Sequence, residues 1–570
     1  MSRHSDYDDQ AETNTIVDEV QTIHEEQGVS KFEKEKEFDP KSFEEEQPSS
    51  RWDNVKRVVV MFGIILALFM VSLNTTVIAP AMSIIATDMN APDEQTWIAT
   101  AYLLAFNSSQ PLSGKFSDIF GRKPVLMFGI LVFFVGCLVN ATTPQMMGLI
   151  AGRTVQGLGG GCVMTMSYVI VADLAPLKWR PRFQSGLTVV YGLASVVGTL
   201  IGGVFVDQLT WRWDFWLNVI LAGTSFIIVV LLLKEPTKVA ESSLLTKLRR
   251  IDWLGTVFVI GFVCCILLAL SWGQSYGWGS GHAIGSFVAA GVSLVLLIIV
   301  EGWVAKEPLF PRGVILNPAV VLFYLYIICL GFCFIGTLYY GPILYQSVFG
   351  ADSMGSGVRL VPYMAMLIVA SLSSGYLLPI FPYIKAFIGL GAITNIIGYG
   401  LFYTVGLNSS WAQQSCYLML CGFAFGLSQQ NTIMGAQSAA DKKYIAIATG
   451  LTNFFMIFAC SIGVAIYQTL FVQFLRYQLT KVDTNILAIA AKYGATSNYL
   501  YIRNMPDDAQ PEIISAYMRA MHSLFIFPLV AAGVAVICAA ICKNTRYGAS
   551  DAKAAKEENH IVVPREKEEV

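Results

Sequence analysis

Long apolar segments alternate with short polar ones along most of the chain. A helix that spans a bilayer needs about 20 mostly apolar residues. Segments that meet this requirement are expected at about 57–82, 95–113, 124–141, 146–171, 186–206, 214–233, 252–272, 284–304, 318–345, 356–378, 384–406, 412–437, 445–473 and 521–542. The pattern therefore predicts an all-α integral membrane protein with about fourteen transmembrane helices.

Composition supports a membrane protein. Of the 570 residues, 55% are hydrophobic and 14% are charged, whereas a soluble domain carries about 25% charged residues. The net charge of −2 gives no indication of a nucleic-acid partner. Most of the eleven cysteines fall inside apolar segments, and the five histidines are scattered. We therefore expect neither a disulfide framework nor a metal site, and we expect no cofactor.

Lysine and arginine gather in the loops that follow even-numbered spans, and short cytoplasmic loops are enriched in these residues. Examples are Lys115, Arg122 and Lys123, then Lys178, Arg180 and Arg182, then Lys306 and Arg312, and finally Lys442 and Lys443. The charged tails, residues 1–56 and 543–570, are expected to be disordered and cytoplasmic. Residues of about 475–520 are expected to form an external loop.

The loop "GKFSDIFGRK", from Gly114 to Lys123, contains an acid as well as three bases. Gly114 and Gly121 permit a tight turn and close helix approach. Asp118 can accept hydrogen bonds from Arg122 or face the N-terminus of a neighbouring helix. A loop that only orients the chain would need the bases alone. The acid and the glycines favour a conformational gate.

This loop resembles the G-x-L-x-D-x-x-G-R-K signature of the major facilitator superfamily, with Phe116 in place of leucine. "RTVQGLGGG" (153–161) and "GLASVVGTLIGG" (192–203) are similar to its fourth-span and fifth-span signatures. Segments 211–219, 251–255 and 345–362 resemble its fungal fourteen-span drug:H⁺ antiporter branch. The resemblance implies two six-helix halves, residues 57–234 and 318–542, separated by a linker with two extra transmembrane helices at 235–317.

Arg153 is the clearest ionisable residue inside a predicted span, and such residues are functional candidates. Gln156, one helical turn away, could accept a hydrogen bond from it. The resemblance implies a coupling role for Arg153, with Gly198 and Gly202 in the antiporter signature. The alternative is an arginine that snorkels to the interface. Asn74 occupies the position where this branch usually has an acid.

The remaining carboxylates are expected at the periphery of the predicted spans. Asp214 lies at an outer end, beside Trp211 and Trp213, which are expected in an interfacial aromatic belt. Polar and aromatic residues inside the spans suit a neutral or weakly charged organic substrate. The candidates for the substrate cavity are Tyr102, Asn107, Tyr191, Gln346, Gln430 and Asn453. Each of them could instead bridge neighbouring helices.

These features predict a secondary active transporter that exports small organic compounds or drugs by alternating access, with protons as a candidate coupling ion. The alternatives are a vacuolar basic amino acid or siderophore transporter and, in a different class, a transporter-like nutrient sensor. The sequence offers no nucleophile–base pair, metal cluster or ATP-binding loop, so it does not predict an enzyme. We expect a monomer in the plasma membrane, with the vacuolar membrane as the alternative.

Overall fold

The computed structural model describes residues 51–78, 81–91, 94–175, 179–233, 243–496 and 499–547. Most of the predicted tails lies outside these residues. The first described helix, α2, begins at Arg51, inside the predicted N-terminal tail. At the other terminus, Arg546 forms an isolated bridge with Tyr383.

The described residues form helices and no β-strand, so the predicted all-α fold is confirmed. Fourteen of these helices have at least 17 residues: α2 (Arg51–Val77), α4 (Gln95–Phe120), α5 (Arg122–Thr142), α6 (Met146–Leu174), α7 (Arg180–Gln208), α8 (Trp213–Leu232), α10 (Trp253–Ser275), α11 (Gly281–Ile299), α13 (Pro318–Ser347), α15 (Val361–Leu377), α16 (Ile384–Tyr403), α17 (Trp411–Ala439), α18 (Ile445–Leu479) and α20 (Gln510–Ile541).

Eleven of the described helices are long and apolar enough to cross a membrane. The other long ones, α4, α7 and α17, carry more polar residues. In α4 and α17 these polar residues are buried against protein, including Asn107–Gln110 and Ser428–Thr432. Polar side chains inside a membrane bundle generally face other helices rather than lipid. The count of fourteen spans stays a prediction.

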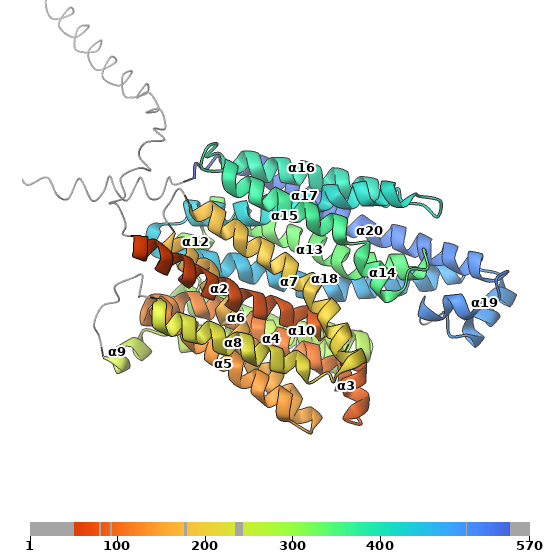
Figure 1. Cartoon of the computed structure of the whole chain (residues 1–570), viewed down its shortest axis with the longest axis horizontal. Helices are drawn as coiled ribbons and strands as arrows, with labels where there is room; N and C mark the ends of the chain where they lie inside the picture. Colours follow the sequence, from red (N-terminus) through yellow and green to blue (C-terminus); the bar gives the residue numbers. More distant parts are fainter. Residues whose placement is uncertain are drawn as a thin grey trace, which may run out of the picture. The chain divides into compact units, whose positions relative to one another are not determined.

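Short helices lie in the connections at both ends of the bundle (Figure 1). We call the end at which α4 meets α5 the proximal end and the opposite end the distal end. The proximal connections contain α9 (Leu244–Arg249) and α12 (Arg312–Ile315). The distal connections contain α3 (Met82–Asp88), α14 (Ser353–Val358) and α19 (Thr484–Lys492). The predicted external loop is shorter than expected, because α18 continues to Leu479 and α20 already begins at Gln510.

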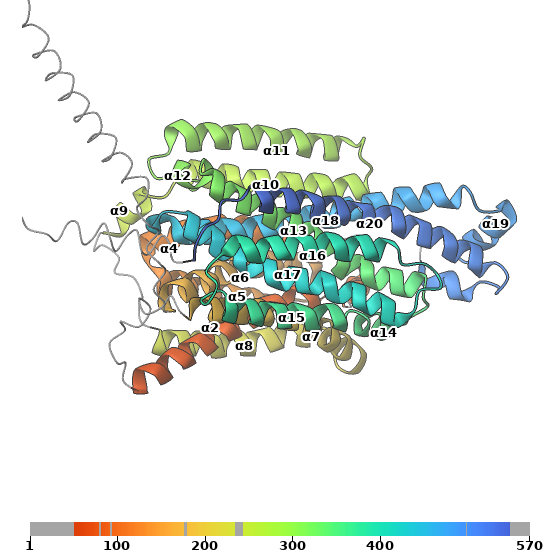
Figure 2. The same ribbon diagram turned by 90° about the horizontal axis from the view of Figure 1, so that it is seen from above.

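The long helices pack in two sets with the same pattern of contacts. In the first set α2 packs on α7 and α8, α6 on α4 and α5, and α5 on α8. In the second set α13 packs on α18 and α20, α17 on α15 and α16, and α16 on α20. The sets meet along two seams, one between α4 and α18 and one at which α7 packs on α15 and α17. The pair α10 and α11 packs on α4 and α18 through α10 (Figure 2).

Glycines allow the tightest contacts within the first set. A Cβ atom on Gly157 or Gly161 of α6 would overlap the backbone carbonyl oxygens of Tyr102 and Phe106 in α4, respectively. The two glycines and the two carbonyls are each four residues apart, so they line one face of each helix. Small residues at this spacing let membrane helices approach closely.

The second set has the same arrangement of glycines. A Cβ atom on Gly422 or Gly426 of α17 would overlap the carbonyl oxygens of Tyr363 and Leu367 in α15, again at a spacing of four. The same physical solution therefore holds α4 against α6 and α15 against α17.

Gly426→Ala is expected to destabilise the protein, because the new methyl group would push α17 away from α15. Such overpacking typically costs about 1–3 kcal/mol. Thermal unfolding of the detergent-purified variants would measure the effect. Gly400→Ala in α16 is the matched control, since the nearest atom to its Cβ is a leucine methyl 3.9 Å away. Equal melting temperatures for the two variants would contradict the close-approach interpretation.

Candidate functional site

The motif predicted as a gate lies at the proximal end of the first set. α4 ends at Phe120 and α5 begins at Arg122, so Gly121 alone joins them. Its backbone has φ +101° and ψ +159°, a conformation that is essentially restricted to glycine. This residue therefore lets the chain reverse direction without a longer loop and places Arg122 beside the end of α4.

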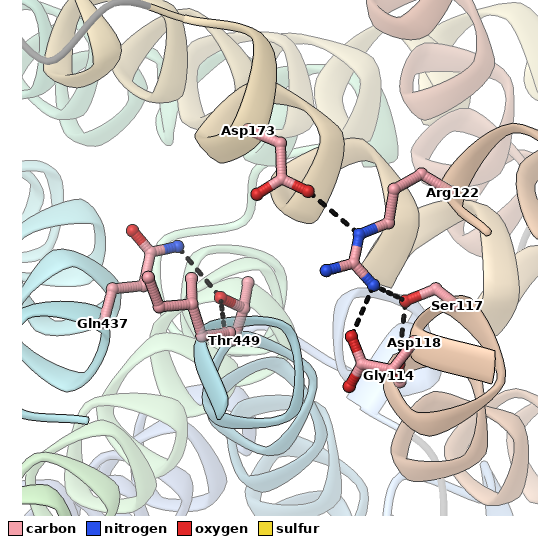
Figure 3. A network of polar contacts seen from close by, with 8 residues as sticks. Gly114, Ser117, Asp118, Arg122, Asp173, Gln437 and Thr449 are labelled. Carbon is pink, nitrogen blue, oxygen red and sulfur yellow. Dashed lines mark hydrogen bonds and ion pairs between the residues drawn. The ribbon is translucent and has the colours of Figure 1, made fainter. Parts of the chain in front are cut away.

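Arg122 connects three helices at this turn (Figure 3). Its Nη1 donates to Asp118 Oδ1 at 2.6 Å and to Ser117 Oγ at 2.8 Å, both in α4. Its Nε donates to Asp173 Oδ2 in α6 at 2.9 Å. The arginine side chain is 11% exposed and each carboxylate partner is 23% exposed. Arg122 thus fixes the end of α4 against α5 and α6.

Gly114, one turn before this ion pair, lies flat against the second set. A Cβ atom there would be 3.1 Å from the carbonyl oxygen of Ala446 and 3.4 Å from the Cα of Ile447, in the first turn of α18. Gly450, one turn further along α18, would place a Cβ 3.4 Å from the carbonyl oxygen of Gln110. The proximal part of the α4–α18 seam is therefore closed by direct backbone contact.

Three further bases of this region have hydrogen-bond partners. Lys115 Nζ donates to Glu307 Oε2 at 2.9 Å, and Arg250 Nε donates to Glu307 Oε1 at 2.7 Å. The hydrogen bond from Arg250, followed by that from Lys115, holds the pKa of Glu307 below its ordinary value. Lys123 Nζ donates to the carbonyl oxygen of Val230 in α8 at 2.9 Å. The ionised Glu307 therefore ties the segment after α11 to the gate motif.

Amide and hydroxyl side chains close the other seam at the same end. Gln184 of α7 donates to Gln437 of α17 at 3.4 Å. Gln437 in turn donates to Thr449 of α18 at 2.9 Å (Figure 3). Ser185 of α7 donates to Gln430 of α17. Gln430, predicted to line the substrate cavity, thus lies in a contact between the two sets.

Arg153 forms the centre of a second polar cluster, in the distal half of the first set. Its side chain is buried, so it does not snorkel to an interface. Nε donates to the Ile98 carbonyl at 2.9 Å, and Nη1 donates to Gln156 Oε1 at 2.9 Å and to Asn74 Oδ1 at 3.2 Å. The guanidinium carbon lies 4.4 Å from the centroid of the Tyr102 ring. Four of the predicted site residues are therefore brought together.

Gln156 extends this cluster. Its Nε2 donates to Asn74 Oδ1 at 2.9 Å, and its Oε1 accepts from Asn140 Nδ2 of α5 at 3.0 Å. Every hydrogen-bond acceptor named for Arg153 is therefore a neutral oxygen. Asp214, expected at the periphery, is instead fully buried in the first turn of α8. Neither of its carboxylate oxygens has a hydrogen-bond partner among the described residues.

The other predicted cavity residues are dispersed. Asn107 of α4 donates to Ser461 of α18 at 3.1 Å, across the seam between the sets. The Tyr191 ring of α7 lies 6.4 Å from that of Phe334 in α13, so it also faces the second set. Asn453 is buried in α18.

Three predicted residues lie apart from these groups. Gln346 donates to Ser356 at 2.9 Å and so joins α13 to α14. Gly198 permits close packing of α7 on α2, since its Cβ would lie 2.8 Å from the Leu73 carbonyl oxygen. Gly202 is buried one turn further along α7. Sequence analysis did not single out Ser185 or Glu307, which are separated in the chain from the residues that they contact.

Comparison with known proteins identifies the family of this chain. The family model described as Major Facilitator Superfamily matches residues 64–464. The chain is 30% identical over 491 residues to the aspyridones efflux protein of Neocamarosporium betae, covering 85% of this chain and 86% of that protein. It is 31% identical over 494 residues to the efflux pump apf11 of Gibberella fujikuroi, covering 84% and 86%.

Solved structures share the fold. The proton:xylose symporter XylE gives a TM-score of 0.54 at 14% identity, covering 88% of this chain and 99% of that chain. The human organic anion transporter MFSD10 gives a TM-score of 0.52 at 14% identity, covering 84% and 99%.

Proposed function

The chain belongs to the Major Facilitator Superfamily and is an integral multi-pass membrane transporter of small molecules rather than an enzyme, and on this premise we propose that it exports small, largely aromatic organic compounds by alternating access. The observation that carries the mechanism is the closure of both seams at the proximal end. Gly114 contacts α18 there, and Gln184 and Ser185 contact α17.

Alternating access requires contacts between the sets that can form and break. The hydrogen bonds described between the sets at the proximal end join neutral groups, such as Gln184 and Gln437, and the Arg182 guanidinium of α7 adds a cation–π contact with Tyr376 of α15, 4.1 Å from the ring centroid. The ion pairs of Arg122 lie within the first set. We propose that the segments predicted as halves, residues 57–234 and 318–542, move relative to each other as rigid bodies. Arg122 keeps α4 rigid, and the contacts between the sets break without separating an ion pair.

The substrate class is proposed from two observations. Curated relatives are named as efflux proteins, one of them for aspyridones. The faces between the sets present aromatic and neutral polar side chains, such as Tyr191 and Asn107, which suit ring stacking and a few hydrogen bonds. The buried Arg153 would favour electron-rich or anionic compounds over cations.

We further propose a monomer in the plasma membrane, with the proximal end and both termini in the cytoplasm. The support is the placement of bases in proximal connections, including Arg122, Lys123, Arg250 and Lys443. The closed proximal end would then correspond to an outward-facing arrangement.

Cysteines placed at Lys443 and Asn485 should react with a membrane-impermeant maleimide from opposite sides of the membrane. Both positions are exposed, and they flank the two ends of the 35-residue helix α18. The background should lack Cys416, the exposed native cysteine. In intact cells only the Asn485 variant should react, and permeabilisation should make the Lys443 variant reactive. Labelling of both from outside would overturn the proposed orientation.

Transport by purified protein in liposomes tests the function. The panel should contain ethidium as an aromatic cation, fluorescein as an aromatic anion, lysine, and the aspyridones named for one relative. We expect saturable movement of an aromatic compound and none of lysine. Movement of lysine would favour a basic amino acid carrier. Binding of a panel compound without movement would favour a sensor.

A further inference from the structure

α2 carries Asn74 instead of an acid, and the buried acid of the first set is Asp214 in α8. Among the described residues, Asp214 is the one acidic residue that is buried, with an exposed fraction of 0%. It lies in the first turn of the 20-residue helix α8. Both carboxylate oxygens lack a hydrogen-bond partner in the described part of the chain. Buried polar groups are normally paired, so an unpaired carboxylate requires an explanation.

The surroundings of Asp214 are apolar. Trp211 and Phe215 on either side of it belong to a buried cluster with Ile98, Ala141 and Leu149. Ile98, Ala141 and Leu149 come from α4, α5 and α6, respectively, so apolar side chains of three helices pack at the start of α8. An ionised carboxylate without a donor is unfavourable in such a place, so this arrangement accommodates the protonated acid.

The same apolar cluster adjoins Arg153. The carbonyl oxygen of Ile98 accepts a hydrogen bond from Arg153 Nε at 2.9 Å. The described acceptors of Arg153 are neutral, so its charge has no ionised partner in this arrangement. Arg153 is the least exposed cation among the described residues, at 1%, and it adjoins the apolar cluster at the start of α8. A positive charge near a carboxylic acid favours release of its proton.

Three other ionisable groups at the distal end of the first set have hydrogen-bond partners. Asp88, after α3, accepts from Trp211 Nε1 at 2.9 Å, and Arg212 donates to the Thr143 carbonyl at 3.1 Å. Cys137 of α5 accepts from Gln156 at 2.9 Å. In α2, the position at which the resembled antiporter branch usually has an acid is Asn74, an amide that cannot exchange a proton.

We propose that Asp214 is the proton-binding site of this transporter and that Arg153 is the charge that promotes proton release from it. The proposal rests on the proposed transport function. In the proximally closed arrangement Asp214 holds a proton. Movement of the sets admits water at the start of α8, where the charge of Arg153 favours ionisation of the acid. The carboxylic O–H bond then breaks, and the proton passes to water on one side of the membrane. A proton from water on the other side restores the acid.

Two measurements on the full chain test the site. The first is infrared difference spectroscopy between acidic and alkaline buffers without substrate. The parent should show the carbonyl stretch of a titrating carboxylic acid. Because the chain has 40 Asp and Glu residues, the test is the difference from the parent: the contribution of Asp214 to this band should be missing in Asp214→Asn and shifted in Asp214→Glu. The exposed Asp88 supplies the control variant Asp88→Asn, which should keep the band. An unchanged band in Asp214→Asn would overturn the proposal.

The second measurement compares two transport modes in liposomes, using the panel compound that the parent exchanges fastest. For Asp214→Asn, uptake driven by a pH gradient should fall by at least about tenfold, whereas equilibrium exchange should change by less than about twofold. Asp214→Glu should retain the gradient drive and shows whether the site tolerates substitution. A merely structural role would reduce both modes together.

The outcomes separate the two proposals. A parent that moves no panel compound contradicts the transport proposal, and the infrared titration still decides whether Asp214 exchanges a proton. A parent that exchanges a compound but ignores the pH gradient preserves the transport function and overturns the role of Asp214. Retained gradient drive in Asp214→Asn also overturns it.

Discussion

Arg122→Ala should reduce the transport rate at least about fivefold while substrate affinity changes by less than about threefold. Removal of the guanidinium leaves Asp118 and Asp173 without their shared partner, at 2.6 and 2.9 Å in the present structure. Loss of one member of a buried ion pair costs about 3–5 kcal/mol. The carboxylates are partly exposed, so we expect about 1–3 kcal/mol, and each 1.4 kcal/mol changes an equilibrium about tenfold.

This cost should appear in conformational exchange, because Arg122 holds α4 in the position that places Gly114 against α18. Turnover and binding should therefore be measured on the same preparation. Arg249→Ala, which removes an exposed base at the end of α9, is the control and should transport like the parent. Normal turnover in Arg122→Ala would mean that the loop only orients the chain.

Arg153→Lys should abolish most transport although it preserves the positive charge. The guanidinium donates to a carbonyl of α4, to Gln156 of α6 and to Asn74 of α2. An ammonium group lacks this planar set of donors. At least one buried acceptor would lose its partner, at about 1–3 kcal/mol each, which corresponds to a change of roughly 5- to 150-fold.

Initial rates in liposomes would measure this effect, with the amount of folded protein fixed by gel filtration. Arg476→Lys, at an exposed position near the end of α18, makes the same chemical change and should be neutral. If Arg153→Lys transports at the parental rate, charge alone is sufficient and the hydrogen-bond geometry around Arg153 has no part in transport.

The sequence predicted features that depend on neighbours along the chain. Long apolar runs predicted the helices, and the membrane-spanning, all-α fold is confirmed. The spacing of Arg153 and Gln156 predicted their contact, because residues three apart on a helix face the same side. The role of that contact in coupling stays a prediction, as do the roles of the gate residues.

Contacts between distant segments could not be predicted in this way. Asp173 is 51 residues from Arg122, and Glu307 is 192 residues from Lys115. Several acids lie near each base in the predicted loops, and sequence alone does not choose among them. Asp214 appeared peripheral because it follows two aromatic residues at the end of a span. The structure buries it because Trp211 turns inward and donates to Asp88.

The pair α10 and α11 makes the two seams of the bundle unequal. α10 packs on both α4 and α18 and so covers the seam between them, and Glu307 fastens the segment after α11 to Lys115 at its proximal end. The seam between α7 and α15 has no such helix among its principal contacts. A lipophilic compound that is dissolved in the bilayer would therefore find one side of the bundle screened and the other facing the acyl chains. Lateral entry from the membrane would be one-sided, which a symmetrical twelve-helix carrier could not impose.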